Sequence, residues 1–344
     1  MNEGLERPLI TSGGLDLIGD IHGHARPLRA LLGQLGYRPH GPSYRHGSGR
    51  QVVFLGDLID RGPEIRETLE IVRAMVDAGD ARAIMGNHEF NAICFHTEDG
   101  EGDYLRSHRP RKNRTQHAAT LAAFADRPGE LEGWIEWFKG LPFFLDLGGA
   151  RAVHATWHGP SLEVLEGKSL RDAAFLEACA RRGTPEFDAI EVALKGISIR
   201  LPGGRRYTDH RGGSWDELRV RWWESPLGKT YRDVAFPAEG KTGLPDVAVE
   251  FGGRQPAWPA YPAGECPVFF GHYWLPPDGV PEPVASNAAC LDYSIAGEGG
   301  RLVAYRWDGE AELSAGRFVS VGRDGVGDTR TSVPGGAMVG DAIT

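Results

Sequence analysis

Four short apolar runs in the first 155 residues each end in a cluster of Gly, Asp, Asn or His. They are LDLIGD, QVVFLGD, ARAIMGN and ARAVHA, at residues 15–20, 51–57, 81–87 and 150–155. A short run of aliphatic and β-branched residues that stops at polar turn residues is typical of a buried strand entering a loop. The pattern therefore predicts four strands, with polar side chains gathered at their carboxyl ends.

The segments between the first three runs have the spacing of amphipathic helices. In PLRALLGQLG the leucines recur on one helical face, and Gly36 follows as a stop signal. In PEIRETLEIVRAMVDAG the apolar positions repeat at intervals of 4, 3 and 4, and Gly79 ends the pattern. Strand, helix, strand, helix, strand is a βαβ arrangement, which predicts an α/β fold with a largely parallel sheet.

Residues 159–265 are rich in Gly and Pro and contain one helical patch, near 168–182, so we interpret this segment as an insertion. Strand character returns afterwards, in a predicted closing antiparallel meander at residues 267–272, 288–294 and 301–307. We therefore expect a single domain with its core at 12–158 and 266–308. A glycine-rich tail at 319–344 is expected to be loosely packed.

Charge and composition exclude several classes of protein. The 344 residues carry 38 Lys+Arg and 47 Asp+Glu, a net charge of −9, which argues against general nucleic-acid binding. No apolar run approaches the roughly 20 residues of a membrane span, and the start MNEGLERPLI lacks a signal pattern, so a cytoplasmic location is expected. The cysteines are far apart, which predicts buried apolar residues rather than disulfides or a thiolate zinc site: Cys94, Cys179, Cys266 and Cys290.

Ligands in open α/β sheets gather beyond the carboxyl ends of the strands, so we pool the polar residues found there. They are Asp20, His22, Asp57, Asp60, Asn87, His88, His154 and His272. Mixed carboxylate, imidazole and amide ligands suit divalent ions such as manganese, iron or zinc. Two ions about 4 Å apart need a bridging carboxylate, and Asp57 is the natural bridge.

The motifs GDIHGH (19–24), GDLIDRGP (56–63) and GNHE (86–89), followed by His154 and by GH at 271–272, resemble the calcineurin-like metallophosphoesterases. Within that superfamily they are similar to the phosphoprotein phosphatase branch, which includes bacterial serine/threonine phosphatases and diadenosine tetraphosphatases. The resemblance implies a β-sandwich of two mixed sheets flanked by helices. Asp292 fills the place of an Asp in the family's closing strands.

The resemblance also implies a role for each matching residue. Asp20, His22 and Asp57 would hold one metal ion, and Asp57, Asn87, His154 and His272 the second. A hydroxide bridging the ions would attack the phosphate ester or anhydride. His88 would be the general acid, oriented by Asp60, and Arg61, Asn87 and His88 would bind the substrate. Glu89 is read as support for the loop. Manganese is the expected ion, with iron, zinc, cobalt and nickel as alternatives.

Two details separate branches of the superfamily. Many phosphodiesterases end their last motif with Gly-His-x-His, whereas this chain has Gly271, His272, Tyr273 and Trp274, which favours the phosphatase branch. His154 is followed by Ala155 rather than Gly-Gly, which resembles the bacterial nucleoside polyphosphatases. The sequence therefore indicates an enzyme that hydrolyses a nucleotide or another small phosphorylated substrate.

Several alternatives remain open at this level. A bacterial protein serine/threonine phosphatase, with a phosphoprotein substrate, has the same chemistry, and a non-catalytic metal-binding module is a more distant alternative. The second phosphate-binding arginine of the family could be Arg219, Arg221 or Arg232. The basic stretch 106–114 could meet further phosphates or form a solvated loop. Trp222 and Trp223 could stack on a base or pack in the interior.

Overall fold

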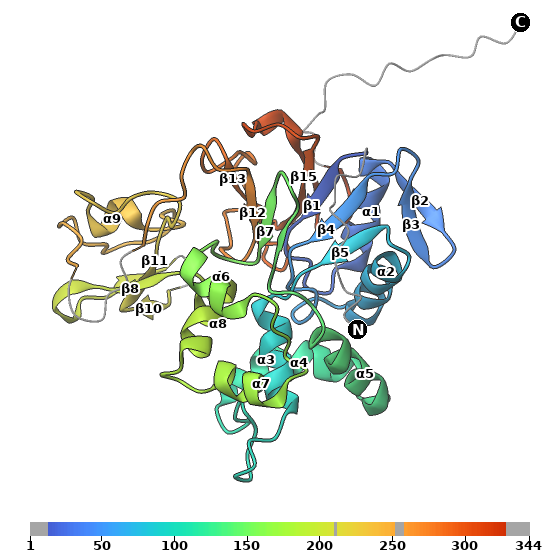
Figure 1. The fold of residues 1–344 in the computed structure, drawn as a ribbon, viewed down its shortest axis with the longest axis horizontal. Helices are drawn as coiled ribbons and strands as arrows, with labels where there is room; N and C mark the ends of the chain where they lie inside the picture. Colours follow the sequence, from blue (N-terminus) through green and yellow to red (C-terminus); the bar gives the residue numbers. More distant parts are fainter. Residues whose placement is uncertain (1–12, 210–211, 252–257, 328–344) are drawn as a thin grey trace, which may run out of the picture.

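Two mixed β-sheets form the centre of the computed structural model, which describes residues 13–209, 212–251 and 258–327 (Figure 1). The first sheet has the order β14 (Asp292–Tyr293), β15 (Arg301–Trp307), β1 (Leu15–Ile18), β4 (Gln51–Phe54) and β5 (Ala81–Ala83), and β16 (Phe318–Gly322) also pairs with β15. The second has the order β13 (Ala288–Cys290), β12 (Val268–Phe270), β7 (Arg151–Val153) and β6 (Phe144–Asp146). The four strands expected from the apolar runs are confirmed.

The first half of the chain follows the predicted βαβ path. Strands β1, β4 and β5 are parallel neighbours, connected through α1 (Ala25–Leu35) and α2 (Ile65–Asp77). The leucine face of α1 is buried, because it packs against β15 and β16. A hairpin of β2 (Tyr37–His40) and β3 (Ser43–His46), which the pattern did not predict, lies between α1 and β4.

The two sheets pack face to face through a shared apolar core. The ring of Phe269 on β12 lies 5.1 Å from the ring of Tyr305 on β15, while α1 and α2 cover the other face of the first sheet. Each sheet combines parallel and antiparallel pairs. The expected α/β sandwich of two mixed sheets flanked by helices is therefore confirmed.

The predicted closing meander is wrong for its first two strands. β12 and β13 are parallel neighbours in the second sheet, beside β7, and only β14, β15 and β16 form an antiparallel meander in the first sheet. Residues 268–270 and 288–290 are buried without alternation, as strands covered on both faces are. That absence of alternation was the signal against a meander.

Segment 159–265 is more regular than its composition predicts. It contains α6 (Gly159–Leu165), α7 (Ala173–Ala180), α8 (Pro185–Lys195), β8 (Ser198–Arg200), a 3₁₀ turn η1 (Pro202–Gly204), β9 (Tyr207–Thr208), β10 (Ser214–Trp215), β11 (Glu217–Arg219) and α9 (Tyr231–Val234). Only α7 matches the expected helical patch. For α8 the local signals were present, because Thr184 caps the first turn through a bond from the Phe187 N–H and Gly196 follows its end.

Three further helices lie between β5 and β6: α3 (Asn87–His96), α4 (Arg111–Ala123) and α5 (Pro128–Phe138). The prediction of a loose tail from residue 319 is wrong for the first residues of that segment. After the 3₁₀ turn η2 (Ala315–Arg317), strand β16 pairs with β15, and residues 318–321 are buried. Residues 328–344, like the start of the chain at 1–12, lie outside the described residues.

Three of the four cysteines are buried, as expected, whereas Cys266 is half-buried, and all four are free thiols. Among the helices in the described ranges, none is both long and apolar enough to span a membrane.

Candidate active site

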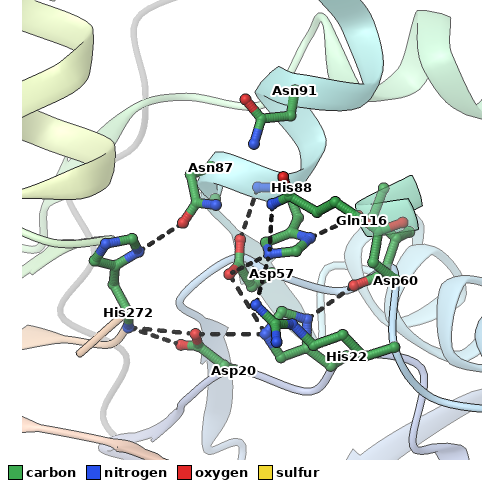
Figure 2. A network of polar contacts seen from close by, with 12 residues as sticks. Asp20, His22, Asp57, Asp60, Asn87, His88, Asn91, Gln116 and His272 are labelled. Atoms are coloured by element: carbon green, nitrogen blue, oxygen red, sulfur yellow. Dashed lines mark hydrogen bonds and ion pairs between the residues drawn. The ribbon is translucent and has the colours of Figure 1, made fainter. Parts of the chain in front are cut away.

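The residues pooled from the strand ends lie together at one edge of the two sheets (Figure 2). Asp20 and His22 follow β1, Asp57 and Asp60 follow β4, Asn87 and His88 begin α3 after β5, His154 follows β7, and His272 follows β12. The parallel strands of each sheet end at the same edge, which brings these loops close to one another. The backbone N–H of His272 donates to Asp20 Oδ1 at 3.1 Å and so joins the loop from the second sheet to the first.

Asp57 lies at the centre of the cluster. Its Oδ2 is 3.6 Å from His22 Nε2, and its Oδ1 is 3.4 Å from His154 Nε2. Asp20 Oδ2 lies 4.0 Å from the same nitrogen of His22. The two oxygens of Asp57 thus face two different groups of ligand atoms, which is the geometry required of a bridging carboxylate.

The second group of ligand atoms surrounds Asn87. Its Oδ1 lies 3.1 Å from His154 Nε2 and 2.6 Å from His272 Nδ1. Asp57, His154 and His272 also place one ligand atom each within 4.8 Å of one another. One carboxylate, one amide oxygen and two imidazoles therefore converge on one point.

Hydrogen bonds to the backbone fix the tautomers of two of these imidazoles. The carbonyl oxygens of Ile59 and Leu55 can only accept, so His22 Nδ1 and His154 Nδ1 donate to them, at 2.9 and 2.7 Å. Both Nε2 atoms then face Asp57. Burial opposes the charged form of His154, but the Asp57 carboxylate outweighs burial and raises the pKa of His154 to about 10, so a bound cation would replace a proton on its Nε2. His22 Nε2 is buried with no hydrogen-bond partner, and so is His272 Nε2. Burial holds the pKa of both imidazoles well below the usual value. Oriented imidazoles and converging oxygens fit two divalent ions.

The backbone around this cluster is strained. The non-glycine residues with positive φ in the described ranges all lie in the cluster or in the loop behind it: His22, Asp57, Asp60, Arg61, His272, Trp274 and Ser294. Such conformations cost on the order of 1–3 kcal/mol each and persist where the surroundings enforce them. Backbone strain that is concentrated in these loops is typical of a functional site, where the surrounding structure holds the side chains in fixed positions.

Glu89 links the loop after β4 to the loop after β5 by hydrogen bonds. Its carboxylate accepts hydrogen bonds from the backbone N–H groups of Gly86 (2.9 Å), Asp57 (2.9 Å) and Leu58 (2.8 Å). Burial and the neighbouring Asp57 carboxylate raise the pKa of Glu89 to about 7, and the bonds from the backbone oppose that rise. Glu89 therefore supports the loops, as expected from the sequence.

Gly271→Ala is expected to disturb the site through contact alone. A Cβ at Gly271 would lie 2.1 Å from Asp20 Oδ1, so the carboxylate or the loop must move. We expect the free energy of unfolding to fall by about 1–3 kcal/mol, measured by urea unfolding. The matched control is Gly129→Ala in α5, where a Cβ meets no atom within 4 Å and better helix propensity should leave stability unchanged or slightly higher. Equal effects of the two substitutions would contradict this packing.

A model of the calcineurin-like phosphoesterase family matches residues 15–181. This part of the chain is a calcineurin-like phosphoesterase domain. The match includes every residue of the predicted site except His272, which the fold adds from β12.

The proteins that are similar to this chain include two curated relatives and one solved structure. The asymmetrical bis(5'-nucleosyl)-tetraphosphatase of Oceanobacillus iheyensis is 42% identical over 74 residues, 22% of this chain and 30% of that protein. The symmetrical enzyme of Aromatoleum aromaticum is 33% identical over 138 residues, 40% of this chain and 42% of that protein. The chain thus spans about 30% of the length of the first of these relatives and 42% of the second. A protein serine/threonine phosphatase structure from Saccharomyces cerevisiae is 13% identical, covers 91% of this chain and 81% of its own, and has a TM-score of 0.44.

In the phosphoesterase domain, His88 and Asp60 form a close pair. His88 Nδ1 lies 2.6 Å from Asp60 Oδ2, and both side chains are buried. The other carboxylate oxygen of Asp60 accepts from His117 Nδ1 at 2.9 Å and from the Thr120 hydroxyl at 2.6 Å. These bonds outweigh burial and hold the pKa of Asp60 below its usual value.

His117 and Thr120 are contacts that sequence reasoning missed. They lie one turn apart on α4, and residues 111–114 of that helix belong to the stretch read only as basic. No motif surrounds them, and 57 residues separate His117 from Asp60. Only the packing of α4 against the β4 loop brings them together.

Arg61 lies at the mouth of the site, next to Trp274. Its guanidinium is 4.1 Å from the centre of the Trp274 ring, and one of its nitrogens is 3.4 Å from His88 Nε2. Asp292 fixes this loop, because its Oδ2 accepts from the Trp274 N–H at 2.7 Å and its Oδ1 from the Ser294 N–H at 3.0 Å. The Asp that resembled a family position thus holds the loop that follows His272.

The two tryptophans and the basic stretch, which the sequence left open as substrate contacts, are partly or fully engaged with other residues. Trp222 and Trp223 are buried against one another and against Phe270, so they pack in the interior and do not offer a face to a base. From the basic stretch, Arg106 turns inward and donates to Asn91 Oδ1 at 3.0 Å and to Gln116 Oε1 at 2.7 Å. Part of that stretch is therefore neither a solvated loop nor free for phosphate.

Among the three candidate arginines, the structure brings only Arg219 close to the predicted ligands. Arg221 donates to the Ala235 carbonyl, and Arg232 to the Leu244 carbonyl. Arg219 is near enough to His272 for its charge to contribute, after burial, to the low pKa of that imidazole. It makes no ion pair with any residue in the described ranges.

Proposed function

We propose that the chain is a dinuclear metal-dependent phosphatase that hydrolyses a phosphate ester or anhydride of a nucleotide or another small phosphorylated molecule. The position of Asp57 between His22 and His154 carries this proposal, because each oxygen of one carboxylate faces a separate set of ligand atoms. The names of the matched relatives, which are bis(5'-nucleosyl)-tetraphosphatases, favour a nucleotide substrate.

In this proposal Asp20, His22 and Asp57 hold one ion, and Asp57, Asn87, His154 and His272 hold the other. Two bound divalent ions would supply a water of lowered pKa and would neutralise phosphate charge. Manganese suits this mixture of oxygen and imidazole ligands, and iron, zinc, cobalt and nickel remain alternatives. We also propose a cytoplasmic location and the phosphoprotein phosphatase branch, on the charge and motif arguments above.

His88 is proposed as the proton donor to the leaving oxygen, with Asp60 orienting it. The 2.6 Å contact at Nδ1 leaves Nε2 directed toward the mouth of the site, where Arg61 lies 3.4 Å away. A carboxylate at Nδ1 holds the imidazole in a fixed orientation, which a general acid needs. Arg61 has a planar fork suited to phosphate oxygens, and Arg219 is the proposed second arginine.

Thr120→Val is expected to lower kcat through Asp60. The substitution keeps the shape of the side chain and removes the donor to Asp60 Oδ1, so the carboxylate no longer orients His88 tightly. Loss of a hydrogen bond to a charged group, at about 1.5–3 kcal/mol, predicts a fall in kcat of tenfold or more with KM within about twofold.

Thr120→Ser is the matched control, because it restores the hydroxyl, and most of kcat should return. An equal loss in the Ser and Val variants would mean that Thr120 acts only through packing.

Side-by-side steady-state hydrolysis tests the proposed substrate class. Manganese-loaded protein is given diadenosine tetraphosphate and a serine/threonine phosphopeptide, with Asp57→Asn as the blank. The proposal expects kcat/KM to be at least about 100-fold higher on the nucleotide, roughly 2.7 kcal/mol of transition-state stabilisation. The reverse ratio would make the chain a protein phosphatase. No metal-dependent turnover of either substrate would overturn the hydrolase itself.

We also propose the division of the chain that the sequence suggests, with a core at 12–158 and 266–308 and an insertion at 159–265. The position of Arg219 on β11, beside His272, supports the insertion as one wall of the cleft.

A further inference from the structure

A cavity of about 660 Å³ adjoins the candidate active site on the side of segment 159–265. Its lining joins that segment, through Tyr207, Trp215 and Arg219, to the loop that follows His272. Trp274 belongs to both places, since its ring lines the cavity and also contacts the Arg61 guanidinium. The cavity therefore begins where the candidate active site ends, and its size is that of a small-molecule site.

Two cations, Arg219 and Lys241, line this cavity. Arg219 and Lys241 make no ion pair within the part of the chain that the structure describes, and the Lys241 ammonium donates to the Pro237 carbonyl. Burial lowers the pKa of Lys241 to about 8, the nearby charge of Arg219 adds to this shift, and the carboxylates of Glu239 and Asp209 oppose it. Two neighbouring, partly buried cations that repel one another are stabilised by an anion between them.

A fixed aromatic face lies in the same cavity. Trp215 is 45% exposed, yet its Nε1 donates to Asp209 Oδ2 at 2.7 Å, which holds the indole in one orientation. An exposed ring that is held in place is a stacking surface for another flat ring. Four carboxylates also line the cavity and can accept hydrogen bonds from hydroxyl or amino groups: Asp209, Glu217, Glu239 and Asp278.

We propose that this cavity binds the leaving group of a nucleotide substrate, with a phosphate between Arg219 and Lys241 and the base against Trp215. Hydroxyl and amino groups of the nucleoside meet the carboxylates of the rim. The inference rests on the proposed function, because it places the reacting phosphate at the metal ligands. A singly phosphorylated peptide lacks the second phosphate that this arrangement fits.

Calorimetric titration of ADP into the manganese-loaded full chain tests the cavity. Lys241→Gln and Trp215→Leu should each weaken ADP binding at least about tenfold, and Trp215→Phe should restore most of the affinity because it keeps a flat ring. The matched control is Lys195→Gln on α8, outside the cavity, where Lys195 pairs with Glu191 and ADP affinity should be unchanged. Unchanged ADP affinity in both cavity variants would overturn the inference.

Hydrolysis of p-nitrophenyl phosphate by the unsubstituted protein separates this inference from the proposed function. Metal-dependent turnover together with ADP binding that is unchanged in the Lys241 and Trp215 variants would contradict ADP binding in this cavity and would support the proposed hydrolase activity. Absence of turnover together with ADP binding that depends on both residues would support a nucleotide site in this cavity and would contradict the proposed hydrolase activity. If Lys241→Gln weakens a serine/threonine phosphopeptide but not ADP, the cavity is a peptide site and the inference is wrong.

Discussion

Asp57→Asn is expected to abolish turnover, with a loss of kcat of about 10³-fold or more, and to release most of the bound metal. The carboxylate oxygens of Asp57 face His22 Nε2 at 3.6 Å and His154 Nε2 at 3.4 Å, so both ligand groups depend on it. An amide has one acceptor oxygen and no charge, and it cannot bridge two cations in the same way. Metal content per chain, measured by inductively coupled plasma mass spectrometry after gel filtration, is the direct readout.

Asp80→Asn is the matched control for Asp57→Asn. Asp80 is a largely buried carboxylate of the same sheet region, bonded to Ser43 at 3.0 Å and Arg45 at 2.8 Å, and it lies outside the cluster of candidate ligands. This variant should lose some stability and keep its metal and its turnover. If Asp57→Asn retained both metal and turnover, Asp57 would not be the bridge.

His88→Asn is expected to keep the metal and lose turnover. General acid catalysis contributes on the order of 10²–10⁴-fold, so kcat should fall by that range on substrates with a poor leaving group. The fall should be smaller on p-nitrophenyl phosphate, whose leaving oxygen needs little help from a proton. Steady-state kinetics on both substrates, with metal content measured in the same preparation, check the result.

The control for His88→Asn is His158→Asn, since His158 bonds to Ser161 at the start of α6 and should leave both quantities unchanged. Near-normal turnover of His88→Asn on a poor leaving group would remove His88 from the role of general acid. Loss of metal in that variant would instead make His88 a ligand, which its position near His22 and Asp57 would permit.

The candidate site was predictable because its residues carry a local signal. Each ligand stands directly after a short apolar run, and parallel strands end at one edge, so the sequence pattern alone groups Asp20, Asp57 and Asn87. The same strand-end pattern also included His154 and His272, although these two follow strands of the second sheet. The backbone bonds that orient the imidazoles depend on loop geometry and leave no trace in the sequence.

The features that sequence reasoning missed depend on packing between distant segments. His117 and Thr120 reach Asp60 only because α4 lies over the β4 loop. The parallel pairing of β12 with β13 was obscured because short apolar runs do not reveal their direction. The sequence offered Trp222 and Trp223 as a possible stacking pair, whereas Trp215, seven residues before Trp222, is the tryptophan with an exposed face. Burial of an aromatic side chain is set by the tertiary fold, and composition does not report it.

Electron paramagnetic resonance during a manganese titration of the unsubstituted protein tests the central claim most directly. The two oxygens of Asp57 face separate ligand groups, so the account predicts two ions per chain at saturation. It also predicts that their spectrum is that of a spin-coupled pair, and that this signal is lost in Asp57→Asn. A single uncoupled ion per chain, or a coupled pair that survives in Asp57→Asn, would contradict a dinuclear centre bridged by this carboxylate.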